Sequence, residues 1–75
     1  MNQRIISIIK DLCEIQKNIT IDDLSQKYNV SQRTIRNDLI SINNILRDNE
    51  LDEMELIAGG QIQRKDNFTN INYFL

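Results

Sequence analysis

Two helix start signals lie close together near the middle of this 75-residue chain, at Thr20 and at Ser31. Thr20 is placed to cap a helix, and Asp23, three residues later, completes a capping box. This first signal predicts a short helix over residues 21–28. Asn29 ends it, because asparagine tolerates the left-handed backbone conformation that closes many helices. The chain is therefore constrained to a short helix, a tight turn and a second helix.

The second start signal predicts a longer helix over residues 32–48. Ser31 is its N-cap, and Val30 is placed to pack on Ile35 as a hydrophobic staple. The apolar side chains of this segment recur at helical spacing and predict a buried stripe: Ile35, Leu39, Ile42, Ile45 and Leu46. A short capped helix, a three-residue turn and a longer helix form the helix-turn-helix plan, in which the second helix lies in the DNA major groove.

Further elements are predicted on either side of this pair. An amphipathic helix is expected over residues 2–17, where the apolar positions repeat with helical periodicity. After the second helix of the pair, residues 54–58 and 61–64 are expected to form two strands joined by a turn at Gly59 and Gly60. The predicted fold is α+β: a winged helix-turn-helix with a three-helix core followed by a two-stranded β-hairpin wing.

We assign residues 1–65 to this DNA-binding domain and residues 66–75 to the start of a linker or connecting helix that leads to a further C-terminal region. The assignment rests on apolar side chains that begin a new face at helical spacing: Phe68, Ile71, Phe74 and Leu75. The same side chains could equally pack on their own domain.

Composition excludes several classes of protein. With Cys13 as the only cysteine and no histidine, the chain cannot hold a disulfide framework, a thiolate zinc site or an imidazole-based catalytic site. We therefore expect a binding module that is not an enzyme and has no cofactor or metal. Cys13 is expected to be a small buried apolar residue. No apolar run approaches the roughly 18 residues of a membrane span, and no secretory signal opens the chain, so we expect a cytoplasmic protein with no membrane partner.

The net charge of −2 hides an uneven distribution. Residues 25–47 carry four cations against Asp38 alone, whereas residues 48–58 carry five carboxylates and no cation. The charge of a local surface patch, more than the net charge of the chain, decides which partner binds there. Asp38 lies at the border of the buried stripe, so we expect it to hold a neighbouring backbone group or cation. The acidic segment is either a solvated turn, a surface for a protein partner or an element that repels misplaced DNA.

The outward face of the predicted second helix carries side chains that suit DNA recognition. They are Arg33, Arg36, Asn37 and Ile40, flanked by Gln32 and Thr34. Arginine pairs with guanine, asparagine or glutamine with adenine, and an aliphatic side chain contacts the thymine methyl. Ser31 and the unpaired N–H groups at the helix start are suited to a phosphate. Lys27, Arg64 and Lys65 complete the candidate contacts.

The stretch Val-Ser-Gln-Arg-Thr-Ile-Arg-Asn-Asp-Leu at residues 30–39 resembles the recognition-helix signature of bacterial winged-helix regulators. It is most similar to the N-terminal domain of activators and antiterminator-related regulators that carry phosphotransferase-system regulation domains. It also resembles deoxyribose-operon-type repressors and the N-terminal domain of the biotin-ligase repressor. The resemblance covers residues 4 to about 63 and implies DNA contacts by Ser31, Arg33, Thr34 and Arg36.

The hairpin departs from that pattern. Regulators of this type often end the hairpin in Gly-x-Gly-aromatic, whereas here Gly59 and Gly60 precede Gln-Ile-Gln and the cations Arg64 and Lys65 come late. The wing is therefore expected to contribute less to DNA binding than is usual for the type.

The resemblance implies sequence-specific binding of duplex DNA by the N-terminal domain of a bacterial transcriptional regulator of sugar uptake or metabolism genes. Phosphotransferase-system proteins would act on the C-terminal region. Because few cations surround the recognition helix, one copy should bind weakly, and we expect a homodimer in the full-length protein. Two alternatives stay open. One is a winged-helix protein–protein module, favoured by the net charge and the acidic segment. The other is the DNA-binding segment of a bifunctional biotin-ligase-type enzyme.

Overall fold

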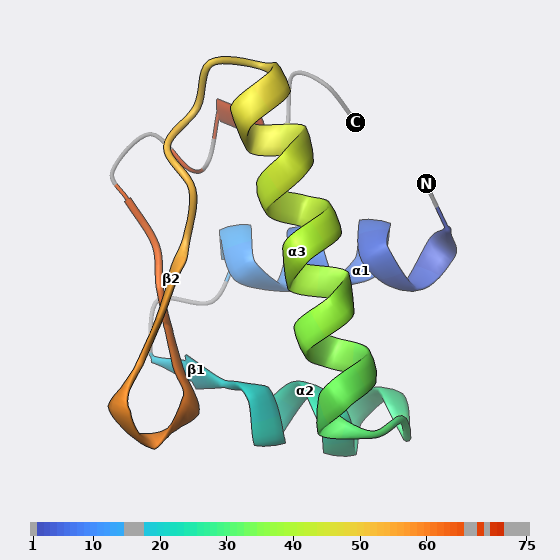
Figure 1. The fold of residues 1–75 in the computed structure, drawn as a ribbon. Helices are drawn as coiled ribbons and strands as arrows, with labels where there is room; N and C mark the ends of the chain where they lie inside the picture. The colour runs from blue at the N-terminus through green and yellow to red at the C-terminus, as the bar shows by residue number, and fades with distance from the viewer. Residues whose placement is uncertain (1, 15–17, 66–67, 69, 72–75) are drawn as a thin grey trace.

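A computed structural model describes residues 2–14, 18–65, 68, 70 and 71. Along the chain it contains α1 (Gln3–Glu14), β1 (Ile19–Thr20), α2 (Ile21–Tyr28), α3 (Gln32–Asp48), β2 (Glu55–Ile57), a 3-10 turn (Ala58–Gly60) and β3 (Gln61–Gln63). The predicted α+β winged helix is confirmed, and the bounds of α2 and α3 agree with those expected (Figure 1). The predicted end of the first helix, residues 15–17, lies outside the described residues.

The sheet contains one strand more than the sequence predicted. Its order is β1-β3-β2 and both pairs are antiparallel, with Ile19 opposite Ile62 and Leu56 opposite Ile62. The predicted two-stranded hairpin is confirmed, but its strands are shorter than expected, since Met54 and Arg64 lie outside them and Ala58 belongs to the turn. The two-residue strand β1 was missed because a segment this short has no periodicity of its own. It becomes a strand by pairing with β3.

Local capping confirms why the helices begin and end where they do. The Thr20 hydroxyl accepts the Asp23 N–H, and the Asp23 carboxylate accepts the Thr20 N–H, each at 3.0 Å, so the capping box is complete. Asn29 closes α2 with φ 53°, in the left-handed region. Ser31 caps α3 by accepting the Thr34 N–H at 3.0 Å. These side chains satisfy amide groups that a helix terminus leaves unpaired.

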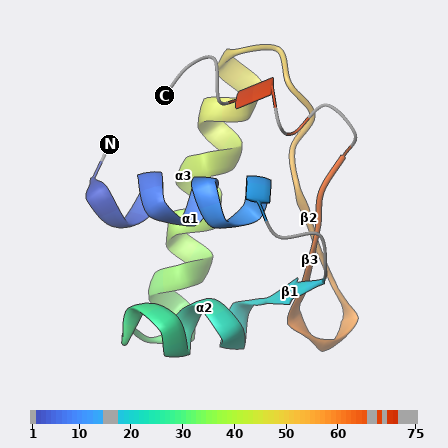
Figure 2. The same cartoon turned by 180° about the vertical axis from the view of Figure 1, so that it is seen from behind.

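One hydrophobic core joins the three helices and the sheet. In the ribbon views α1 crosses behind α3, α2 packs near the start of α3, and the tip of the hairpin points to the same end of the molecule as α2 (Figures 1 and 2). The core includes Phe68 and Ile71, which are 2% and 0% exposed. These two residues from the expected connector therefore pack on this domain, whereas Phe74 and Leu75 lie outside the described residues. Cys13 is half-buried against the core.

Candidate nucleic-acid interface

The turn between α2 and α3 is held by two hydrogen bonds between Ser25 and Val30. The Val30 N–H donates to the Ser25 carbonyl at 3.1 Å, and the Ser25 hydroxyl donates back to the Val30 carbonyl at 2.8 Å. Val30 also packs against the core. Because the αL residue Asn29 and this pair of bonds fix the turn, the angle between α2 and α3 is set before any ligand binds.

The outward face of α3 presents the side chains that the sequence singled out for base contacts. Arg33, Arg36 and Asn37 are exposed, and Ile40 is 60% exposed. Arg36 and Asn37 lie three and four residues after Arg33, and Ile40 lies four and three residues after them, so the set lies along one side of the helix. The structure therefore brings these four predicted residues together on one surface.

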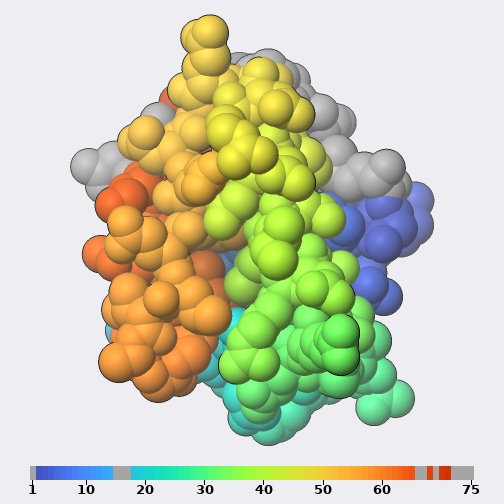
Figure 3. All heavy atoms as spheres, viewed as in Figure 1, coloured from blue at the N-terminus to red at the C-terminus, as the bar shows by residue number. Residues whose placement is uncertain are grey.

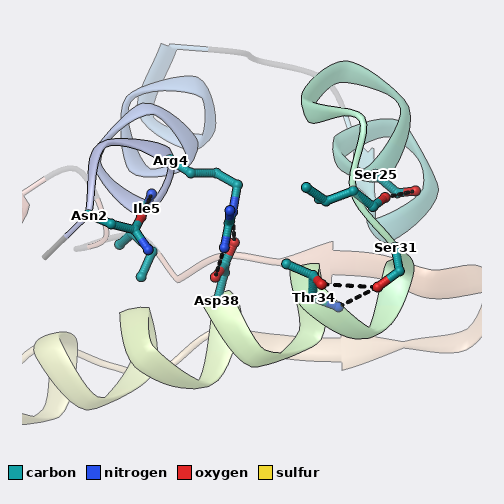
Figure 4. Close-up of polar contacts among 8 residues, drawn as sticks. Asn2, Arg4, Ile5, Ser25, Ser31, Thr34 and Asp38 are labelled. Carbon is teal, nitrogen blue, oxygen red and sulfur yellow. Dashed lines mark hydrogen bonds and ion pairs between the residues drawn. The ribbon is translucent and has the colours of Figure 1, made fainter.

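The flanking candidates at the start of α3 are partly engaged within the protein. The Gln32 amide donates to the Asp22 carboxylate at 3.2 Å. Thr34 is half-buried, and its hydroxyl shares a 3.0 Å hydrogen bond with the hydroxyl of Ser31, the N-cap (Figure 4). The hydroxyls of Ser31 and Thr34 thus shape the helix start, where the exposed N–H groups and the positive end of the helix dipole favour an anion.

Most cations of the described residues have a partner. The described residues form four ion pairs: Arg4–Asp38 at 2.6 Å, Lys27–Asp11 at 2.8 Å, Arg47–Glu53 at 3.0 Å and Lys65–Glu55 at 3.7 Å. Arg64 donates to the Leu12 backbone carbonyl. Within the described part of the chain, only Arg33, Arg36 and Lys10 make no ion pair or side-chain hydrogen bond, and two of these three lie on the outward face of α3.

Asp38 is turned away from that face. It is 5% exposed, and its carboxylate accepts two hydrogen bonds from the Arg4 guanidinium, at 2.6 and 3.1 Å, which join α1 to α3 (Figure 4). The expectation that Asp38 holds a cation is confirmed. The hydrogen bond to Asp38, together with the charge of that carboxylate, raises the pKa of Arg4. The one acidic residue of α3's N-terminal half therefore does not oppose an approaching phosphate.

Lys27 lies beside the helix pair in a small cluster that joins α1 to α2. Its ammonium pairs with Asp11 and lies 5.5 Å from the centre of the Tyr28 ring, while the Tyr28 hydroxyl donates to the same carboxylate. Burial and the bond to Asp11 raise the pKa of Tyr28 above its ordinary value. The Lys27 side chain is still 54% exposed, so it remains on the surface near the start of the interface.

The two wing cations lie against other parts of the fold. The Arg64 guanidinium is bonded to the last turn of α1, and Lys65 pairs with Glu55 across the hairpin. The structure therefore engages Arg64 with α1 and Lys65 with a carboxylate of the wing. The register that pairs Glu55 with Gln63 could have revealed the Lys65 contact, since residues two positions beyond a cross-strand pair are neighbours. The contact of Arg64 has no comparable signal, because its acceptor is a backbone carbonyl 52 residues away.

Sequence reasoning missed the role of Asn43. Its side-chain amide donates to the Met54 carbonyl at 3.1 Å and accepts the Met54 N–H at 2.8 Å. Asn43 thereby fixes the start of the wing against α3. Two carboxylates of the acidic segment, Glu53 and Glu55, are held by ion pairs with Arg47 and Lys65.

The described residues contain no group of three or more metal-ligating side chains and no helix long and apolar enough to cross a membrane. Comparison with known proteins gave no match among curated proteins or solved structures. Residues 4–59 match the HTH domain family, and the match includes α1 from its second residue onward and all of α2 and α3. Since this match covers well over half of the chain, the protein belongs to the HTH domain family, a family of DNA-binding domains.

Proposed function

We propose that this chain binds duplex DNA sequence-specifically through the outward face of α3 and is the DNA-binding domain of a transcription regulator. The observation that carries the proposal is the state of Arg33 and Arg36. Both are exposed on one side of α3 and have no carboxylate partner among the described residues, whereas the other described cations except Lys10 are neutralised or bonded inside the protein. Family membership supports DNA as the partner.

In this proposal α3 enters the major groove with its N-terminal half against the base edges. Arg33 and Arg36 reach guanine, and Asn37 and Gln32 reach adenine, because their forked donors and acceptors match those bases. The start of α3 at Ser31 binds a phosphate through its N–H groups and dipole.

The flanking contacts are weaker in our proposal. Lys27 contacts the phosphate backbone beside the groove, since more than half of its side chain is exposed. Lys65 reaches a phosphate only by leaving Glu55, at 3.7 Å the longest of the described ion pairs. We leave Arg64 outside the contact set, because its guanidinium is bonded to Leu12. The wing therefore adds little electrostatic attraction.

The finer assignment rests on the resemblance of residues 30–39 to bacterial sugar regulators. It supports a cytoplasmic regulator of sugar uptake or metabolism genes that acts as a homodimer and responds to phosphotransferase-system proteins through a further region. A biotin-ligase-type enzyme would carry a ligase domain after Leu75, so the sequence that follows this chain separates the two cases.

The test is a selection of binding sites from random duplexes with the 75-residue chain, followed by fluorescence anisotropy with the selected duplex. We expect Arg33→Ala and Arg36→Ala each to lose about 1–3 kcal/mol of specific binding, roughly 5- to 150-fold in Kd. Lys10→Ala is the matched control. It removes an unpaired exposed cation from α1 and should leave specific binding nearly unchanged. Thermal unfolding of all three variants should match the wild type.

Two results would contradict the proposal. If no sequence is enriched and no duplex binds at low salt, the net charge of −2 and the acidic segment favour the protein–protein module instead. If a duplex is selected but Lys10→Ala weakens binding more than the arginine variants, the DNA lies on α1 and the assignment of α3 is wrong.

A further inference from the structure

A groove runs between the recognition helix α3 and the wing strand β2. It holds about 240 Å³ and is bounded by Ile40 on α3 and Leu56 on β2, with Leu39, Met54 and Ile62 beneath. The space-filling view shows α3 and the wing side by side on this face of the molecule (Figure 3). The lining is mostly apolar, which is unusual for a surface that also carries Arg36.

The groove is formed in the protein before anything binds. Its floor belongs to the core, since Leu39, Met54 and Ile62 are each less than a tenth exposed. Its width is fixed on one side by the two bonds between Asn43 and Met54. On the other side the pairing of Leu56 with Ile62 turns the Leu56 side chain to the same face of the sheet as Ile62, toward α3.

The walls of the groove carry large apolar side chains that are exposed to solvent. Ile40 is 60% and Leu56 48% exposed, and together with Ile57 they are the exposed large hydrophobic residues of the described chain. A single exposed aliphatic residue is ordinary. Two of them facing each other over an apolar floor form a surface that is suited to a small apolar group.

The residues around the groove indicate which kind of chemical group it is suited to bind. Arg36 lines the groove without a carboxylate partner among the described residues, and Ile40 follows it by one helical turn on the same side of α3. The groove is thus continuous with the surface that faces the base edges. Glu55 also lines it, and its carboxylate pairs with Lys65 at 3.7 Å. Because the rest of the lining is mostly apolar, the group that fits the groove is an uncharged apolar group next to a base edge.

We propose that Ile40 and Leu56 bind the 5-methyl group of a thymine in the target site, so that this groove makes thymine a preferred base beside the one that Arg36 contacts. The thymine methyl is the apolar group that the major-groove edges of the four bases present. The inference rests on the proposed DNA binding by α3. It adds a wing residue, Leu56, to the side chains that recognise the DNA sequence.

The test removes methyl groups from the DNA one at a time. In the selected duplex each dT is replaced by dU, which keeps every hydrogen bond and lacks the methyl. We expect one or two positions at which wild-type affinity falls about three- to tenfold, the effect of losing one buried methyl group. Ile40→Ala and Leu56→Ala should bind the dT and dU duplexes equally at those positions. Ile57→Ala is the control: it changes an exposed residue of β2 outside the groove lining and should keep the full dU penalty.

The outcomes separate the inference from the proposed function. If the wild type binds no duplex, the proposed function itself fails. If it binds the selected duplex tightly and every dU substitution is neutral, only the inference is overturned. It is also overturned if the dU penalty persists in both Ile40→Ala and Leu56→Ala. A wild-type dimer in sedimentation that Ile40→Ala dissociates would show that a second copy, and not thymine, covers the groove.

Discussion

The contact between Asn43 and Met54 gives a sharp prediction, because a single side chain there joins the wing to the recognition helix. Asn43→Ala removes both hydrogen bonds, of 3.1 and 2.8 Å, and leaves the backbone N–H and carbonyl of Met54 without that partner in a partly buried place. Each such bond contributes about 0.5–1.5 kcal/mol net, so we expect a loss of about 1–3 kcal/mol.

That loss is large for a chain of this size. At roughly 0.05–0.15 kcal/mol per residue, a 75-residue domain has about 4–11 kcal/mol of stability. Each kcal/mol lowers the Tm of such a domain by about 4–8 °C. Asn44→Ala is the matched control on the next residue. Asn44 is exposed and its side chain only accepts a hydrogen bond from Arg47, so its loss should change stability by less than about 0.5 kcal/mol.

The assay is urea unfolding followed by circular dichroism, with amide hydrogen exchange at Met54 as a local readout. We expect the unfolding midpoint of Asn43→Ala to fall clearly below that of Asn44→Ala, and the Met54 N–H to exchange faster. Equal midpoints and unchanged exchange at Met54 would refute the reasoning, since the two bonds would then contribute nothing to holding the wing.

Two further predictions concern the helices. Ile35 is fully buried in α3, so Ile35→Ala should destabilise the chain by about 2–5 kcal/mol and Ile35→Val by only about 0.5–1.5 kcal/mol; equal denaturant midpoints for the two variants would contradict this. Burial and the bond to Asp11 raise the pKa of the Tyr28 hydroxyl above its unfolded value of about 10. The Tyr28 hydroxyl therefore contributes fully to the free energy of unfolding below about pH 10. This contribution is lost as the pH rises further, because the unfolded state releases the phenol proton first. An absorbance titration against Tyr28→Phe measures this, and a Tyr28 phenol that ionises near pH 10 in the folded chain would contradict it.

The sequence predicted the helix pair well because its signals are local. The bounds of α2 and α3 follow from side chains that bond to backbone groups within three residues, as Thr20 does with Asp23 and Ser31 with Thr34. The position of Asn29 in the left-handed region depends only on its own backbone preference. Interactions between residues only a few positions apart can be predicted from a single sequence.

The features that the sequence did not reveal depend on distant partners. Strand β1 exists because Ile19 meets Ile62, and neither residue indicates the other. Phe68 and Ile71 follow helical spacing, which is equally consistent with a connecting helix and with the core they join. The groove required the relative position of α3 and β2, which the amide of Asn43 sets. Only the fold brings these groups together.

The same reasoning explains how a chain with a net charge of −2 presents a basic recognition surface. Two of the carboxylates near α3 are held by cations: Asp38 by Arg4 from α1, and Glu53 by Arg47 in the last turn of α3 itself. Such pairs cancel their fields at short range, and salt screens what remains beyond about 10 Å. Arg33 and Arg36 have no such partner among the described residues, so their charges are the ones a phosphate or a base edge meets. A DNA-binding face therefore depends less on how many cations a chain contains than on which of them the fold leaves unpaired.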